Sequence, residues 1–229
     1  TLDLILANPN ATGIFLSLDD PKRVILNRFQ GVWTGLPLND IQQPKRLGDP
    51  DLGLLVEGYQ SLTELAEANR LFVREATEID DIDTLERYVQ SKANRDLFLV
   101  IDDIHNLQVN GGSLETRQEN MERAKRLKQL STEYDMPVVT TAELRKSVPG
   151  NGNPQPTTQD IAETMKFAYA ADLIFLLYPE NLGDYEREEE PVVKLKCAKN
   201  KLSDYRGEDD LKFTKVSSRM EELGNPMGL

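Results

Sequence analysis

Short, continuous apolar runs alternate along the chain with longer amphipathic segments. Runs of this kind are typical of strands that are buried on both faces of a parallel sheet. The alternation of strand and helix predicts right-handed βαβ crossovers in a doubly wound, mainly parallel α/β fold. The strand candidates are residues 13–18, 71–73, 97–101, 137–141 and 173–177.

Capping residues mark where two helices are expected to begin. Asp20 and Pro21 predict a helix that starts with a cap residue and a proline in its first turn. A threonine at position 157 or 158 is expected to cap a helix that runs to residue 171. Residues 114–133 form a longer amphipathic segment rich in Arg, Lys and Glu.

The C-terminal part of the chain has a different pattern. Residues 191–197 and 211–216 flank a polar, turn-rich stretch, which predicts an antiparallel hairpin at the sheet edge. Residues 148–156, rich in Gly, Asn and Pro, and the acidic residues 181–190 are expected to be mobile loops. Residues 217–229 are expected to form a tail.

The composition is that of an ordinary soluble domain, and it excludes several classes of protein. The formal net charge of −12 argues against broad, passive binding to nucleic acid but leaves room for a narrow basic loop. One cysteine and one histidine allow neither an internal disulfide nor a zinc cluster, and they favour a reducing cytoplasm. No window approaches the roughly 18 apolar residues that a membrane span needs, so no membrane partner is expected.

Two carboxylates follow strand candidates. Asp102 ends the run 97–101, and open α/β sheets bind their ligands at the carboxyl ends of their strands. A carboxylate there holds Mg²⁺ in nucleotide-hydrolysing enzymes, usually through water, but a strand can also simply stop at an acidic turn. Asp19 follows the run 13–18 and can either activate a water molecule or cap the next helix. The residues alone leave these alternatives open.

Three more polar side chains are candidates. Glu143 follows the run 137–141 and either senses a terminal phosphate or marks an ordinary change from strand to loop. Lys199 and Lys201 lie on the predicted hairpin. Such cations can reach the nucleotide of a neighbouring subunit, as an arginine finger does, or they can protect an edge strand from unwanted pairing.

Taken in order, these stretches resemble the RecA-like ATPase domain of the DnaB replicative-helicase family. Ile14–Asp19 is similar to the family's strand ending Ser-Leu-Glu, whose Glu is the catalytic base. Leu97–His105 is similar to the family's Walker B strand. Ala198–Lys201 is similar to the family's Ala-Lys-Gln-Arg, which carries the pair of residues that act as the arginine finger. The resembling stretches are Ile14–Asp19, Leu97–His105, Arg117–Glu119, Pro137–Val148, Ala171–Tyr178 and Ala198–Lys201.

The resemblance implies a DNA-acting motor that hydrolyses ATP with Mg²⁺ between the subunits of a homo-oligomeric ring or filament. Single-stranded DNA is the implied partner, although the two loops that would contact it also read as plain solvated loops. The residues implied are Asp102 for the metal, Asp103 beside it for the nucleotide, Asp19 as the base, Glu143 at the sensor position, Lys199 and Lys201 from the neighbouring subunit, and Asn110, Gly111, Gly112, Arg145 and Lys146 for DNA.

The chain departs from the family's pattern at several of these positions. Asp19 is one methylene shorter than the family's Glu. Glu143 replaces a Gln, and its charge would repel a γ-phosphate. Lys201 replaces an Arg and cannot make the bidentate fork of a guanidinium. Together these changes predict a slow or divergent ATPase.

The phosphate-binding motif Gly-x-x-x-x-Gly-Lys-[Ser/Thr] does not occur in the 229 residues. We expect residues 1–9 to be the remnant of the P-loop helix, the P-loop to lie upstream, and residues 1–229 to form one RecA-like domain that binds ATP poorly on its own. Two other classes stay open. One is a non-hydrolysing assembly or loader module, with the acidic residues 185–190 as its interaction surface. The other is a KaiC-type regulatory ATPase with a tandem second core.

Overall fold

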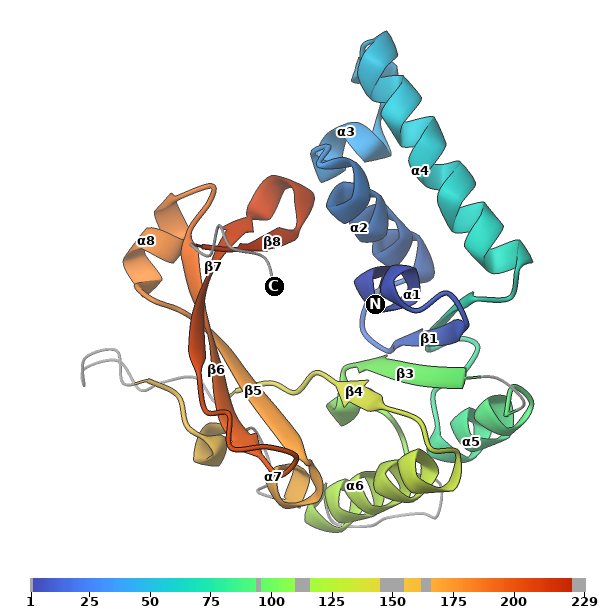
Figure 1. The fold of residues 1–229 in the computed structure, drawn as a ribbon, viewed down its shortest axis with the longest axis vertical. Helices are drawn as coiled ribbons and strands as arrows, with labels where there is room; N and C mark the ends of the chain where they lie inside the picture. Colours follow the sequence, from blue (N-terminus) through green and yellow to red (C-terminus); the bar gives the residue numbers. More distant parts are fainter. Residues whose placement is uncertain (1, 94–95, 110–115, 145–154, 162–165, 224–229) are drawn as a thin grey trace.

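The computed structural model describes residues 2–93, 96–109, 116–144, 155–161 and 166–223. Figure 1 shows a parallel and an antiparallel sheet with helices around them. Among the described residues, no helix has both the length and the apolar character to cross a bilayer. The α-helices are α1 (Leu2–Ala7), α2 (Lys22–Thr34), α3 (Leu38–Gln42), α4 (Asp49–Glu67), α5 (Ile82–Gln90), α6 (Thr116–Glu133), α7 (Lys166–Ala170) and α8 (Leu182–Arg187).

Four parallel strands form the first sheet, in the order β2-β1-β3-β4. The two central strands pair along their whole length, from Ala11 opposite Asp96 to Ser17 opposite Asp102. The first four predicted runs are confirmed as these strands, and the α/β fold class is confirmed with them. The strands are β1 (Ala11–Ser17), β2 (Leu71–Glu75), β3 (Asp96–Asp102) and β4 (Val138–Thr140).

The second sheet is antiparallel, in the order β5-β6-β7-β8. The predicted hairpin is confirmed as β6 and β7, which pair with each other. It does not extend the parallel sheet, because β6 pairs on its other side with β5. The strand β8 lies within the stretch expected to be a tail. The strands are β5 (Leu173–Pro179), β6 (Val192–Asn200), β7 (Glu208–Thr214) and β8 (Arg219–Glu222).

The prediction that residues 173–177 belong to the parallel sheet is wrong. They form most of β5, which pairs antiparallel with β6. Ile174 and Leu176 are buried, whereas Leu173, Phe175 and Leu177 are 39%, 50% and 43% exposed. The run is therefore apolar on both faces but buried on only one. Hydrophobicity alone cannot distinguish it from a strand that is covered on both sides.

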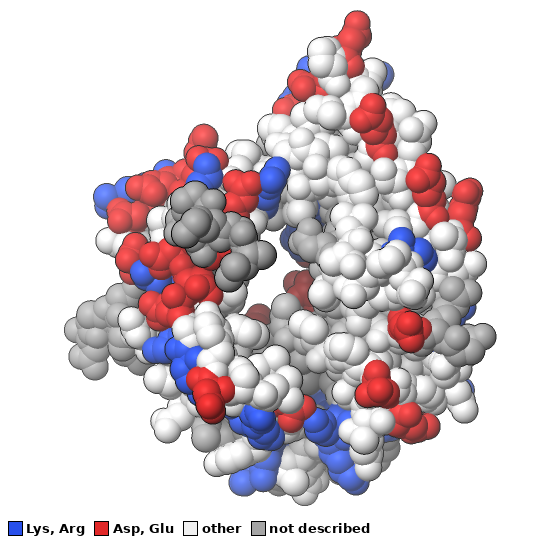
Figure 2. All heavy atoms as spheres, in the orientation of Figure 1, with Lys and Arg blue, Asp and Glu red and all other residues white. Residues whose placement is uncertain are grey.

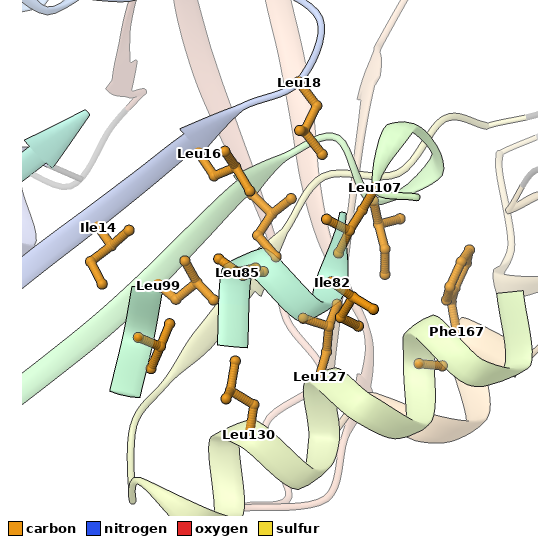
Figure 3. Close-up of a cluster of buried hydrophobic side chains, with 14 of the residues drawn as sticks. Ile14, Leu16, Leu18, Ile82, Leu85, Leu99, Leu107, Leu127, Leu130 and Phe167 are labelled. Carbon is orange, nitrogen blue, oxygen red and sulfur yellow. The ribbon is translucent and has the colours of Figure 1, made fainter. Parts of the chain in front are cut away.

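One apolar core joins the two sheets, and Figure 3 shows the part of it that comes from β1, β3 and the helices α5, α6 and α7. Ile14 of β1 and Leu99 of β3 are fully buried and pack in the same cluster as Leu127 of α6. That cluster continues through Phe167 of α7 to Leu176 of β5. Because the helices α6 and α7 also contact each other, the antiparallel sheet shares a core with the parallel one.

The helix α2 begins one residue later than its start signal predicts. It starts at Lys22, with Pro21 in the N-cap position, and the Pro21 side chain makes no capping hydrogen bond. Asp20 is therefore not the cap residue. Its carboxylate instead forms an ion pair with Arg28, 2.6 Å away, on the first turns of the same helix.

The acidic residues 181–190 contain the helix α8, so the prediction of a loop is wrong there. The helix forms because Asn181 Oδ1 accepts hydrogen bonds from the backbone N–H groups of Gly183 and Asp184. An Asn in the N-cap position satisfies donors that the first turn would otherwise leave free.

The predicted cap at Thr157 is confirmed, but the element that it caps is short. Thr157 precedes the 3₁₀-helix Thr158–Asp160, and the two ends of this turn form a capping box. Downstream, α7 starts at Lys166. The intervening residues 162–165 lie outside the described part of the chain.

Two helical glycines should respond in opposite ways to substitution by Ala. A Cβ at Gly31 in α2 would lie 2.6 Å from the carbonyl oxygen of Ser217, which precedes β8, and 2.8 Å from Leu38. A Cβ at Gly53 in α4 would meet nothing within 4 Å. Urea denaturation should show that Gly31→Ala lowers the free energy of unfolding by about 1–3 kcal/mol and that Gly53→Ala raises it by roughly 0.5–1 kcal/mol. A gain for both variants would contradict close packing of α2 against Ser217.

Candidate nucleotide site

The carboxyl ends of the central strands bring Asp102 and the Asp19 turn to one edge of the parallel sheet. β1 and β3 are direct neighbours, and Ser17 lies opposite Asp102. The chain continues from Ser17 into a bend at residues 18–20. The backbone N–H of Leu18 donates to the carbonyl oxygen of Asp102 at 2.7 Å, so the bend is attached to β3. The two aspartates therefore leave neighbouring strands at the same edge of the sheet.

The Asp102 carboxylate is half-buried and is held from β4. The hydroxyl of Thr141, just beyond β4, donates to Asp102 Oδ1 at 2.6 Å. The backbone N–H of Thr141 also donates to the carbonyl oxygen of Ile101 at 3.0 Å. This further bond fixes the hydroxyl relative to β3. Thr141 therefore orients the carboxylate through one oxygen and leaves Oδ2 for a ligand.

The donor set at this edge fits Mg²⁺ bound mainly by water and phosphate. Within the described ranges, no three His, Cys, Asp or Glu side chains gather closely enough to hold a metal ion. Mg²⁺ does not need such a cluster, because it keeps several waters and takes one or two carboxylates together with phosphate oxygens. Asp102 can supply that carboxylate. The 229 residues contain no Gly-x-x-x-x-Gly-Lys-[Ser/Thr] motif, the motif that grips phosphates in such sites.

The Asp19 side chain is exposed on the bend. Among the described residues, no hydrogen bond or ion pair engages its carboxylate, and it does not cap α2. The structure therefore does not support the alternative that Asp19 is a plain helix cap. A free carboxylate at this edge can orient and deprotonate a water molecule.

Asp103 and Glu143 have less distinctive surroundings. Asp103 Oδ1 accepts a hydrogen bond from the backbone N–H of Asn106 at 3.1 Å and so caps a short 3₁₀-helix. That contact supplies a structural reason for Asp103, whose role at the nucleotide stays a prediction. Glu143 is exposed after β4, and its role as a phosphate sensor also stays a prediction.

The two hairpin lysines bind to the end of α7 within their own chain. Lys199 Nζ donates to the carbonyl oxygens of Ala168 and Tyr169. Lys201 Nζ donates to the Tyr169 carbonyl oxygen at 3.3 Å and lies 3.7 Å from the Asp172 carboxylate. Partial burial, reinforced by the neighbouring Lys201, lowers the pKa of the Lys199 ammonium. Figure 2 shows Lys and Arg side chains gathered at this end of the molecule, over α6 and α7.

Asp172 links the lysine cluster to α6. Its carboxylate pairs with Lys128 of α6 as well as with Lys201. The hydrogen bond from Lys128 lowers the pKa of Asp172. Sequence reasoning did not find this link, because Lys128 and Asp172 are far apart in the chain and no motif joins them.

The residues predicted to contact DNA lie outside the described part of the chain. This applies to Asn110, Gly111 and Gly112 in one loop and to Arg145 and Lys146 in the other. Their role therefore stays a prediction. Thr141 belongs to a run that the sequence did single out, but its bond to Asp102 becomes visible only once β4 is known to pair with β3.

The doubly wound domain, with two carboxylates at the carboxyl edge of its central strands, has a RecA-like fold. The chain belongs to the family of the DnaB-like helicase C terminal domain, whose model matches residues 3–222. It is 26% identical over 142 residues to the replicative DNA helicase DnaC of Bacillus subtilis, a match that covers 57% of this chain and 30% of that relative. It is also 26% identical over 142 residues to the replicative DNA helicase DnaB of Geobacillus stearothermophilus. The chain thus spans less than a third of the length of these relatives.

Solved structures show the same fold. One solved ATPase domain superimposes with a TM-score of 0.83 at 17% identity, covering 96% of this chain and 77% of that one. A DnaB-like replicative helicase, described with its interactions with primase, gives a TM-score of 0.79 at 18% identity and covers 93% of this chain and 51% of that one. The predicted resemblance to the DnaB family is confirmed.

Proposed function

We propose that this chain is the ATPase core of a DNA-acting motor in the cytoplasm, of the kind found in replicative helicases. The observation that supports this most is the shared edge of Asp19 and Asp102. Family membership explains why the strands have this order. The conformation of the Asp19 bend and the orientation of the Asp102 carboxylate then supply the chemistry.

Each of the two aspartates has a distinct task in this proposal. Asp102 would hold the magnesium ion of ATP, directly or through water, while Thr141 keeps Oδ1 fixed. Asp19 accepts a proton from the attacking water molecule. Bound Mg²⁺ would neutralise charge on the triphosphate. With a side chain one methylene shorter than Glu, Asp19 must approach the water closely or act through another one, which predicts a slow enzyme.

The exposed edges of β4 and β5 favour a position between these two strands for a phosphate-binding segment. Among the strands that the structure describes, β4 and β5 are edge strands of their respective sheets, which share one core. Val139 of β4 is 48% exposed and Phe175 of β5 is 50% exposed. Unpaired edges with exposed apolar side chains are suited to pairing with another strand. A strand inserted there, parallel to β4, would carry its phosphate-binding loop to the edge where Asp102 lies.

Lys199 and Lys201 are proposed to act on the nucleotide of a neighbouring subunit in a homo-oligomer. Their present bonds to α7 carbonyl oxygens hold both ammonium groups at the end of β6. Those bonds also explain the lysines without any nucleotide. The contacts of Lys201 are exposed, and an exposed ion pair contributes little stability, so they do not prevent this lysine from exchanging partners when a subunit docks.

ATP turnover by the full-length protein, with and without single-stranded DNA, tests the proposal. We expect slow, magnesium-dependent turnover that DNA accelerates several-fold. Turnover that does not respond to DNA would contradict the helicase-like function and favour a regulatory ATPase. Absence of turnover from a correctly assembled protein would favour the non-hydrolysing loader module.

A further inference from the structure

The bend that carries Asp19 is fixed at its start and in its middle. The Leu18 N–H donates to the Asp102 carbonyl oxygen at 2.7 Å. The hydroxyl of Ser17, which is fully buried, donates to the carbonyl oxygen of Asp20 at 2.7 Å. The backbone on both sides of Asp19 is therefore tied to the sheet.

The far end of the bend is tied to the opposite neighbouring strand, β2. The backbone N–H of Lys22, the first residue of α2, donates to Glu75 Oε2 at 2.6 Å. Glu75 is the last residue of β2 and lies opposite Ser17 of β1. Its other oxygen, Oε1, accepts a hydrogen bond from the Thr77 hydroxyl at 2.8 Å. The bond from Lys22 holds the pKa of the Glu75 carboxyl below its usual range, so a negative charge faces the start of α2 at neutral pH.

The Lys22 N–H is the first backbone donor that follows Asp20, because Pro21 has no N–H. Asp side chains commonly accept from the backbone N–H three residues further along at the start of a helix. Two aspartates of this chain do so: Asp81 accepts from the N–H of Thr84, and Asp103 accepts from that of Asn106. Asp19 has the same sequence spacing to Lys22, although Lys22 is the first residue of α2 and a bond between them would close a turn before the helix.

Glu75, on the neighbouring strand β2, accepts the hydrogen bond from the Lys22 N–H in place of Asp19. Because its carboxylate already binds the Lys22 N–H, the Asp19 carboxylate is not drawn back onto its own backbone. The N–H of Lys22, the first residue of α2, is therefore satisfied without Asp19, although Pro21 offers no capping side chain. Asp19 is left exposed on a bend that three hydrogen bonds hold in place.

We propose that Glu75 is a positioning residue for Asp19. By taking the Lys22 N–H, it keeps the Asp19 carboxylate free at the edge of the sheet where Asp102 lies. This inference rests on the proposed function, since it concerns how the base is presented to water. Glu75 itself touches neither nucleotide nor metal in this proposal.

Steady-state ATP turnover of full-length variants tests the proposal. Glu75→Ala should lower kcat about tenfold, with KM for ATP changed less than about twofold, because the loss concerns water activation and not nucleotide binding. Glu75→Gln should retain most of the rate, because its amide oxygen can still accept from the Lys22 N–H. Thr77→Ala is the matched control: it removes the other contact of Glu75 and should leave kcat within about twofold.

A comparison of Glu75→Ala with and without Asp19→Asn separates failure of this inference from failure of the proposed function. In a protein that already carries Asp19→Asn, Glu75→Ala should cause no further loss, because the two residues act through one group. A Glu75→Ala protein as active as the parent, beside an inactive Asp19→Asn protein, would overturn the inference and leave the proposed function standing. An equal loss from Glu75→Ala in both backgrounds, or a loss confined to KM, would also overturn it. An active Asp19→Asn protein would overturn the inference and the assignment of Asp19 as the base, and it would leave the proposed ATPase function standing.

Discussion

Replacing Asp102 by Asn should reduce ATP turnover by the full-length protein roughly 100-fold or more. The amide keeps the shape of the side chain and can still accept the Thr141 hydrogen bond. It loses the negative charge that holds Mg²⁺. Metal stabilisation of a transferring phosphoryl group is worth several kcal/mol, and each 1.4 kcal/mol changes the rate about tenfold.

The control for this variant lies on the same strand. Asp96 is exposed at the other end of β3, at the amino edge of the sheet. Asp96→Asn removes the same charge far from the proposed site and should leave turnover within about twofold. Equal rates for Asp102→Asn and the parent protein would refute the metal assignment.

Asp19→Asn should also lower turnover by about 100-fold, while ATP still binds. General-base catalysis commonly contributes about 10²–10⁴ to a rate, and an amide cannot accept the proton. Nucleotide binding should survive, because in our proposal Asp19 contacts the attacking water and not the phosphates. Fluorescent-nucleotide titration beside the turnover assay separates the two effects.

The neighbouring Asp20 provides the matched control for Asp19. Its carboxylate is engaged with Arg28 in a partly exposed ion pair, a contact worth about 0–1 kcal/mol. Asp20→Asn should therefore leave kcat nearly unchanged. If Asp20→Asn abolished turnover and Asp19→Asn did not, the base would have to be reassigned to the adjacent residue.

Local hydrophobic pattern predicts the parallel half of the fold well. The strands β1 and β3 are continuous apolar runs with a polar residue at the end, and both faces of each are covered by helices or neighbouring side chains. The same pattern fails for β5, which is equally apolar but has one open face. It also fails for α8, where a single capping Asn organises an otherwise acidic stretch.

The candidate site can be predicted only as far as each residue follows a strand. Asp19 and Asp102 come directly after such runs, so their common edge follows from parallel pairing. The contacts that hold them do not follow. These contacts join elements that are far apart in the sequence, and the order of residues does not reveal which elements are neighbours. The residues that make them are Thr141, Glu75 and Lys22. The sequence also does not reveal the partners of Lys199 within its own chain, because α7 and β6 come together only when the chain folds.

The most direct test is a structure of the full-length protein with Mg²⁺ and a non-hydrolysable ATP analogue. We predict that the magnesium ion and the phosphates bind at the edge of the parallel sheet where Asp102 lies, and that Asp19 faces the terminal phosphate. A nucleotide bound at another edge, or an Asp19 carboxylate turned onto the Lys22 N–H with the nucleotide in place, would contradict the account.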